Sequence, residues 1–180
     1  SGLCLSAYAA WRLGHRLTIA VSAVTLGAAL LAVSWAPSLS AMRVLLVLLG
    51  AGSGLYLPSA IAALTENTRE ASWGRALAVH ELGPNFAYIG APLLGELLLR
   101  FLSWRGVLAA VGAPAILLGA AFLLSRLGAA SRAQPPSPAA MAPLIRDRAF
   151  WGMAGLFLIS VGAGLGLYTM LPLFLIHAVG

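Results

Sequence analysis

Charge is scarce in this sequence. Only 9% of its 180 residues are charged and 61% are hydrophobic, whereas roughly 25% of an ordinary soluble domain is charged. Lysine is absent, so all eleven basic residues are arginine. The net charge of +6 does not indicate nucleic-acid binding, because the arginines are scattered rather than clustered on one face. This composition excludes an ordinary soluble domain.

Cysteine and histidine are also rare. Cys4 is the single cysteine, which excludes an internal disulfide and a cysteine metal cluster. His15, His80 and His177 lie far apart in the sequence, so we predict no metal site. No phosphate-binding loop occurs either, and we therefore expect no cofactor.

What the sequence does have is long apolar runs. The run GVLAAVGAPAILLGAAFLL, residues 106–124, approaches the roughly 20 residues that cross a ~30 Å hydrocarbon core. Such runs are too numerous for a signal peptide, and the short alternating segments of a membrane barrel are missing. We predict an all-α membrane protein, a multi-pass helical bundle embedded in a lipid bilayer.

Polar and proline-rich breaks divide the chain into one partial and five full spans. The partial span covers about 1–10, and the full spans lie near 18–36, 42–64, 75–99, 106–125 and 149–177. Prolines in the break over 125–148 indicate a linker. We predict a half-bundle over 1–125, an interdomain linker over 126–148 and the first helix of a second half-bundle over 149–180. Because Ser1 begins inside an apolar segment, we expect the chain to be part of a longer protein.

The arginines are distributed unequally between alternate breaks. Eight arginines fall in or beside the breaks over 11–16, 66–75 and 125–148, and three, Arg43, Arg100 and Arg105, fall on the other side. By the positive-inside rule the first set of breaks is cytoplasmic. We expect an integral protein of the bacterial cytoplasmic membrane.

Four local motifs occur in a fixed order. They are Arg12-Leu13-Gly14-His15-Arg16 in the first break, the glycine-rich run from Gly50 to Pro58 followed by Glu66, the pair Pro92 and Gly95, and Ser103-Trp104-Arg105 just before the fourth full span, 106–125. This order resembles the major facilitator superfamily, from the end of that family's helix 2 through its helix 7. Trp11 stands where the family's loop signature has an aspartate, so no role of that aspartate is transferred.

The resemblance implies a secondary transporter rather than an enzyme. It implies movement of a small-molecule substrate by alternating access, with a coupling proton or ion, and a parent chain that supplies the missing helices. A non-transporting membrane sensor or assembly subunit is the alternative. A serine protease is disfavoured because Ser53 and His80 fall at different depths.

One span carries a polar stripe on an otherwise apolar helix. At ~100° per residue, the residues Glu81, Asn85, Tyr88, Pro92 and Glu96 fall within about 80° of one another. Such groups inside a membrane indicate a substrate or ion path. The candidates for this path or for coupling are Glu81, His80, Asn85, Tyr88, Tyr56 and Tyr168.

Structural alternatives stand beside each of these functional readings. Glu81 and His80 are equally suited to pair with Arg69 or Arg75 as a structural lock that holds a gate closed. Asn85 is equally suited to hydrogen-bond a neighbouring helix. The tyrosines are equally suited to pack in a core or at the membrane interface. Arg12, Gly14 and Arg16 form either a cytoplasmic latch or ordinary membrane anchors. Residues expected to pack or bend helices are Gly50, Gly54, Pro58, Pro92, Gly95, Gly162, Gly166 and Pro172.

Overall fold

The computed structural model describes residues 2–125, 142–143 and 145–179. Every regular element in these ranges is helical, and none of them contains a strand, which confirms the predicted fold class. The chain divides into two compact units, Ser1–Pro135 and Pro136–Gly180, and each is treated by itself. Most of the predicted linker, residues 126–141 and 144, lies outside the described residues.

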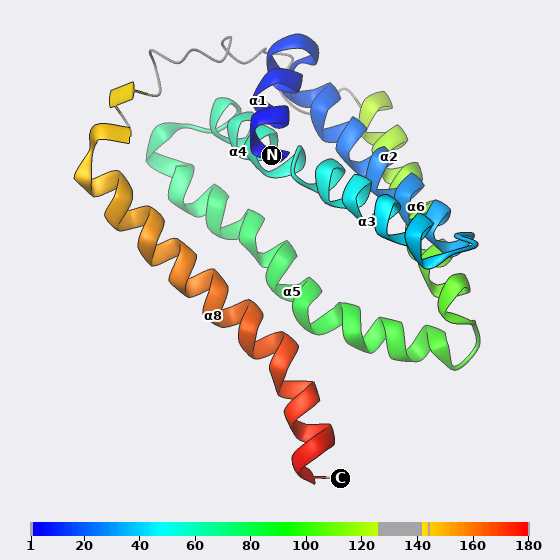
Figure 1. Cartoon of the computed structure of the whole chain (residues 1–180). Helices are drawn as coiled ribbons and strands as arrows, with labels where there is room; N and C mark the ends of the chain where they lie inside the picture. The colour runs from blue at the N-terminus through cyan, green and yellow to red at the C-terminus, as the bar shows by residue number, and fades with distance from the viewer. Residues whose placement is uncertain (1, 126–141, 144, 180) are drawn as a thin grey trace. The chain divides into compact units, whose positions relative to one another are not determined.

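Helices of very different length make up the first unit (Figure 1). In chain order they are α1 (Gly2–Leu13), α2 (His15–Ser34), α3 (Leu39–Ser53), α4 (Tyr56–Glu66), the short 3-10 helix η1 (Glu70–Ser72), α5 (Trp73–Leu99) and α6 (Trp104–Leu124). The described part of the second unit contains α8 (Arg148–Val179).

Four stretches of the described chain are long and apolar enough to cross a membrane. They are His15–Ser34, Leu39–Glu66, Trp104–Leu124 and Arg148–Leu167. The 27-residue α5 is not among the four, since polar residues and two prolines interrupt its apolar surface. It is nevertheless the helix on which the polar stripe was predicted.

The first predicted break is almost entirely helical. Between α1 and α2 only Gly14 departs from the helix, with φ 84°, a conformation that glycine adopts without steric penalty. Gly14 N donates to Ala10 O at 2.9 Å, and Thr18 N donates to Gly14 O at 3.1 Å. The prediction of a six-residue loop over 11–16 was therefore wrong, because one glycine is enough to join the two helices.

Serine side chains start two of the helices. Ala41 N donates to the Ser38 hydroxyl oxygen at 3.2 Å before α3. Gly106 N donates to the Ser103 hydroxyl oxygen at 3.3 Å before α6. Both serines satisfy amides that have no partner inside their helix. Ser38 lies between the predicted spans 18–36 and 42–64, and Ser103 lies between the predicted spans 75–99 and 106–125.

The predicted span over 42–64 is interrupted in its middle. The helix ends at Ser53 and begins again at Tyr56. Pro58 has no N–H to donate to Gly54 O, so the regular hydrogen-bond pattern fails at this point. Leu55 N turns instead to Gly52 O at 3.1 Å. Gly54 and Pro58, which were expected to pack or bend this helix, lie at the interruption.

Serines from two other helices hold this interruption. The Ser22 hydroxyl of α2 donates to Gly52 O at 2.8 Å, and the Ser6 hydroxyl of α1 donates to Leu55 O at 3.1 Å. Both serine side chains are buried. Carbonyls near the break thus receive donors from neighbouring helices, as a helix inside a membrane requires.

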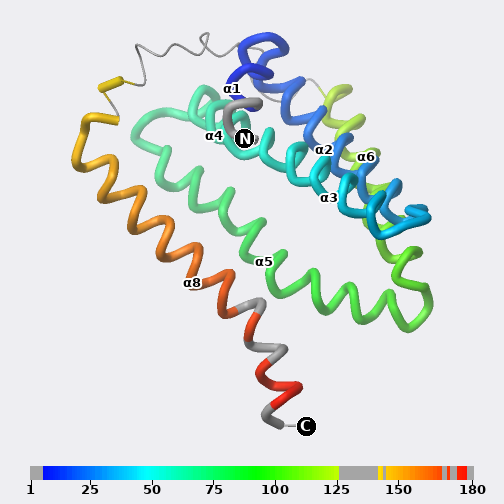
Figure 2. Tube along the Cα trace, viewed as in Figure 1, coloured from blue at the N-terminus to red at the C-terminus, as the bar shows by residue number. Residues whose placement is uncertain are grey.

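The closest helix contact of the first unit joins α2 and α6, whose traces run side by side in Figure 2. A Cβ added to Gly27 would lie 2.5 Å from Gly112 O, and one added to Gly119 would lie 3.1 Å from Ala20 O. Glycine therefore lets the two backbones touch, which is the usual basis of helix association in a membrane.

The glycines chosen from the sequence are not those that pack here. A Cβ on Gly50 would meet nothing within 4 Å, whereas one on Gly52 would lie 2.9 Å from Thr25 Cγ2. Close packing at Gly50 was thus the wrong prediction for the first unit. The glycine that contacts α2 is two residues further on, because that face of α3 turns toward α2.

The second unit contributes one long helix. Ala149 N donates to Asp147 Oδ1 at 2.9 Å at its start, and Trp151 Nε1 donates to Ile145 O at 2.8 Å. Gly162, Gly166, Tyr168 and Pro172 all lie in the helical backbone of α8. The side chains of Tyr168 and Pro172 are outside the described residues.

Candidate functional site

Two of the predicted path residues meet across the interrupted helix. Tyr56 is the first residue of α4 and His80 lies in the second turn of α5. The Tyr56 hydroxyl is 3.2 Å from His80 Nε2, and the two rings are stacked with centroids 6.0 Å apart and planes 17° apart. The restart of the broken helix is thereby joined to the polar helix.

The pair borders a cavity of about 400 Å³. Its walls are mostly apolar, with polar atoms from the tyrosine, the histidine and one amide. The residues that line it come from α2, α4, α5, α6 and the position just after α4: Ile19, Tyr56, Ala60, Ala63, Leu64, Asn67, His80 and Phe122. A mostly apolar cavity with a few converging polar groups is typical of a small-molecule site.

Glu81 extends the polar contacts of the histidine. Its Oε1 lies 3.4 Å from His80 Nδ1, and its side chain is 55% exposed while that of His80 is 14% exposed. One tautomer satisfies both ring nitrogens: Nδ1–H donates to Glu81, and the Tyr56 hydroxyl donates to Nε2. Tyr56, His80 and Glu81 therefore form a continuous row from the cavity to an exposed carboxylate.

The lock predicted between Glu81 and the neighbouring arginines does not form in the described chain. Its ion pair is with His80, and neither Arg69 nor Arg75 is within 4.0 Å of it. Arg75 is six residues earlier on the same helix, which at ~100° per residue turns it about 120° away. The alternative reading of Glu81 as a lock to Arg69 or Arg75 was therefore wrong in this conformation.

Further along α5 the stripe is bound mainly to its own helix. Asn85 Nδ2 donates to Glu81 O at 2.7 Å, one turn earlier. Glu96 Oε1 accepts from Arg100 Nη2 at 3.0 Å, the pairing that their i,i+4 spacing predicts. Tyr88 is half-exposed, and no residue of α5 is buried.

Prolines loosen the hydrogen bonding of this same helix. Pro84 and Pro92 both lie inside α5. Neither can donate to the carbonyl four residues earlier, which belongs to His80 and to Tyr88. Pro84 was not predicted to bend the helix, although it lies only four residues after His80. The weakest backbone of α5 thus coincides with its polar residues, and Gly95 lies one turn after Pro92.

The arginines of the first break have separate contacts. The Arg12 guanidinium lies 4.6 Å from the centre of the Trp11 ring and 5.6 Å from that of Tyr8. Arg16 donates through Nη2 to Leu123 O in the last turn of α6. Arg16 therefore ties the start of α2 to the end of α6, whereas Arg12 rests on the aromatic residues of its own helix.

The contact of a buried histidine with an exposed glutamate was not predicted from the sequence. His15 is 6% exposed, and its Nε2 lies 4.0 Å from Glu66 Oε1. Its Nδ1 is buried and has no hydrogen-bond partner. The sequence signal was the ridge of His15, Thr18 and Ser22 on one face of a span that otherwise looked apolar, since these positions are three and four residues apart.

Apolar helices of membrane-spanning length, a helix interrupted at mid-length and a cavity with a short polar row define a multi-pass helical membrane protein of the transport class. The family model described as Major Facilitator Superfamily matches residues 2–180, and the chain belongs to that family of transporters. The resemblance stated from the sequence is thus confirmed. No curated protein and no solved structure matched the chain.

Proposed function

We propose that this chain forms part of a secondary active transporter that moves a small solute by alternating access. The observation that carries the proposal is the contact of Tyr56 with His80 over the cavity. It links the only described helix that restarts in mid-span to the helix that bears the polar stripe. In transporters, interrupted helices commonly surround the substrate site.

The proposed roles follow from depth and polarity. Tyr56, Asn85 and Tyr88 line the path. Glu81 and His80 are the proposed coupling pair, because the two ring nitrogens of His80 contact one group each, the Tyr56 hydroxyl and the Glu81 carboxylate. The remaining helices of a larger parent chain would complete the path.

Movement is proposed to occur at the interrupted helix. Pro58 prevents a continuous hydrogen-bond ladder there, and Ser6 and Ser22 hold the two sides of the break through single hydrogen bonds. Breaking either of these hydrogen bonds costs little, because one hydrogen bond contributes a net stabilisation of about 1 kcal/mol. Tilting α4 would open or close the cavity through Tyr56.

The membrane orientation is part of the proposal. The segments over 11–16, 66–75 and 125–148 would face the cytoplasm of a bacterial cell, because they carry the excess of arginine. In that orientation the His80 and Tyr56 contact lies toward the cytoplasmic half of the bilayer.

A labelling experiment tests alternating access without knowledge of the solute. In the full-length natural chain with Cys4→Ser, a single cysteine is introduced as Asn85→Cys. The control is Leu117→Cys, at a residue of α6 that is 69% exposed. Right-side-out and inverted vesicles are then treated with a membrane-impermeant thiol reagent. We expect Asn85→Cys to react from both sides and Leu117→Cys from neither.

Labelling of Asn85→Cys from one side only, or from neither, would contradict alternating access. A non-transporting sensor or assembly subunit would then be the better description. Equal labelling at Leu117→Cys would mean that the reagent or water crosses the bilayer, and vesicle integrity would have to be restored before the comparison.

A further inference from the structure

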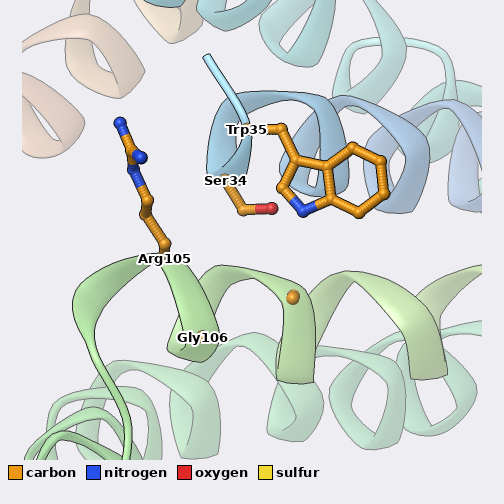
Figure 3. Close-up of a pocket in the computed structure, with 5 residues that line it drawn as sticks. Ser34, Trp35, Arg105 and Gly106 are labelled. Carbon is orange, nitrogen blue, oxygen red and sulfur yellow. The ribbon is translucent and has the colours of Figure 1, made fainter. Parts of the chain in front are cut away.

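A second cavity lies where α2 ends and α6 begins. Its volume is about 430 Å³, and its lining residues are Ser34, Trp35, Arg105, Gly106 and Ala109. Figure 3 shows Ser34 and Trp35 coming from the end of α2 and Arg105 from the first turn of α6. None of these residues lines the cavity beside Tyr56 and His80, so the two cavities share no lining residue.

Arg105 brings an uncompensated positive charge to this cavity. Its Nη2 donates to Ala36 O at 3.2 Å, and its guanidinium lies 5.1 Å from the centre of the Trp104 ring. No carboxylate lies within 4.0 Å of it in the described residues, unlike Arg100, which is paired with Glu96. A guanidinium has five N–H donors, so most of them remain for an acceptor.

The surroundings of Arg105 are aromatic and exposed. Trp35 is 83% exposed, Phe101 79% and Trp104 47%. Because α2 and α6 are each long enough to span the membrane, their ends lie at the depth of the lipid headgroups. Tryptophan is enriched at that depth, where its ring meets acyl chains and its N–H meets water.

We propose that this cavity binds the headgroup of an anionic phospholipid. The phosphate accepts hydrogen bonds from Arg105, which matches its planar fork of donors. The glycerol and the upper acyl chain lie along Trp35 and Ala109. The site is independent of the transport path, so it stands whether or not the proposed function is correct.

The sequence contains this site in the Ser103-Trp104-Arg105 motif. Ser103 caps α6, Trp104 lies under the guanidinium, and Arg105 reaches back to the end of α2. The motif therefore fixes one charged group at a helix junction, at the depth where phosphate lies.

Quenching of Trp35 and Trp104 fluorescence by brominated lipids tests the site. The full-length natural chain, in which Trp35 and Trp104 are kept and the other tryptophans are replaced by phenylalanine, is placed in phosphatidylcholine bilayers that contain brominated phosphatidylglycerol or brominated phosphatidylcholine. We expect half-maximal quenching at about a fivefold lower fraction of the anionic lipid, as one arginine near a membrane surface contributes about that factor.

Variants identify the residue responsible. Arg105→Gln should abolish the preference, and Arg100→Gln, a matched change at the same end of the helix pair, should leave it intact. Arg105→Lys, which keeps the charge, should retain at least half of it. Equal quenching by both lipids in the unmodified site, or an undiminished preference in Arg105→Gln, would overturn the proposal.

Two controls separate the remaining explanations. If Arg105→Lys remains folded by circular dichroism but behaves like Arg105→Gln, a positive charge in this cavity does not recruit the anionic lipid, and the proposal is wrong. If millimolar inorganic phosphate removes the preference for phosphatidylglycerol, the cavity is a site for a soluble anion, and the lipid assignment is wrong.

Discussion

Replacing Gly27 with alanine is the sharpest test of the packing described above. The new methyl carbon would lie 2.5 Å from Gly112 O, 2.7 Å from Ile116 Cγ1 and 2.9 Å from Ile116 N. Two of these three neighbours are backbone atoms, which cannot rotate away. To reach ordinary van der Waals contact, α2 and α6 must separate by about an ångström at this point.

The expected cost can be set against a matched control. Overpacking of this kind costs about 1–3 kcal/mol, and alanine returns about 0.5–1 kcal/mol through its higher helix propensity. We therefore expect Gly27→Ala to destabilise the protein by about 1–2 kcal/mol. Gly50→Ala adds the same methyl group where nothing lies within 4 Å, and it should be neutral or stabilising.

Thermal unfolding in mild detergent, followed by far-ultraviolet circular dichroism, measures the difference. For a chain of this size, 1 kcal/mol corresponds to roughly 2–4 °C in Tm. Gly27→Ala should therefore melt several degrees below the unmodified chain, and Gly50→Ala should not. Equal melting of the two variants would refute the argument that α2 and α6 touch through glycine.

Three further predictions concern the break, the missed pair and the proposed coupling group. Ser22→Ala removes the donor to Gly52 O, so we expect a loss of about 1 kcal/mol in unfolding free energy, and an unchanged value would mean that water replaces the serine. His15→Ala and Glu66→Ala, measured singly and together, should show a coupling of about 0.5–1 kcal/mol, whereas additive effects would mean that the 4.0 Å pair contributes nothing. Glu81→Gln should abolish uptake driven by a proton gradient while leaving solute exchange, and an unaltered pH profile of uptake would remove Glu81 from the mechanism.

The helices themselves were predictable from the sequence, because each depends on a long apolar run and on local stop signals. Ser38 and Ser103 cap α3 and α6, and both serines lie between predicted spans. The polar stripe of α5 was equally local, since the spacing of Glu81 and Asn85 is a property of the helix alone.

What could not be predicted depended on other helices. Pro58 and Gly54 indicate where the helix is weakest. Whether the helix is interrupted there depends on hydrogen bonds from Ser6 and Ser22, which lie more than 25 residues earlier in the chain. Many glycines look suitable for close packing, and only the meeting of α2 with α6 selects Gly27 over Gly50.

The candidate site was predictable in part for the same reason. Tyr56 and His80 were each named as path residues, yet no local pattern indicates that they touch, because their contact depends on how α4 resumes after its break. Burial of His15 was also hidden, since its partner Glu66 lies at the far end of another helix.

The unequal lengths of the helices set a mechanical constraint on the membrane. The 20 and 21 residues of α2 and α6 measure about 30 Å at 1.5 Å per residue, which matches the hydrocarbon thickness with both helices upright. The 27 residues of α5 measure about 40 Å, so this helix would lean or project if it crossed the same bilayer. A change in its lean would then carry Glu81 and Asn85 up or down relative to α2 and α6. Bilayer thickness would in this way act directly on the depth of the polar stripe.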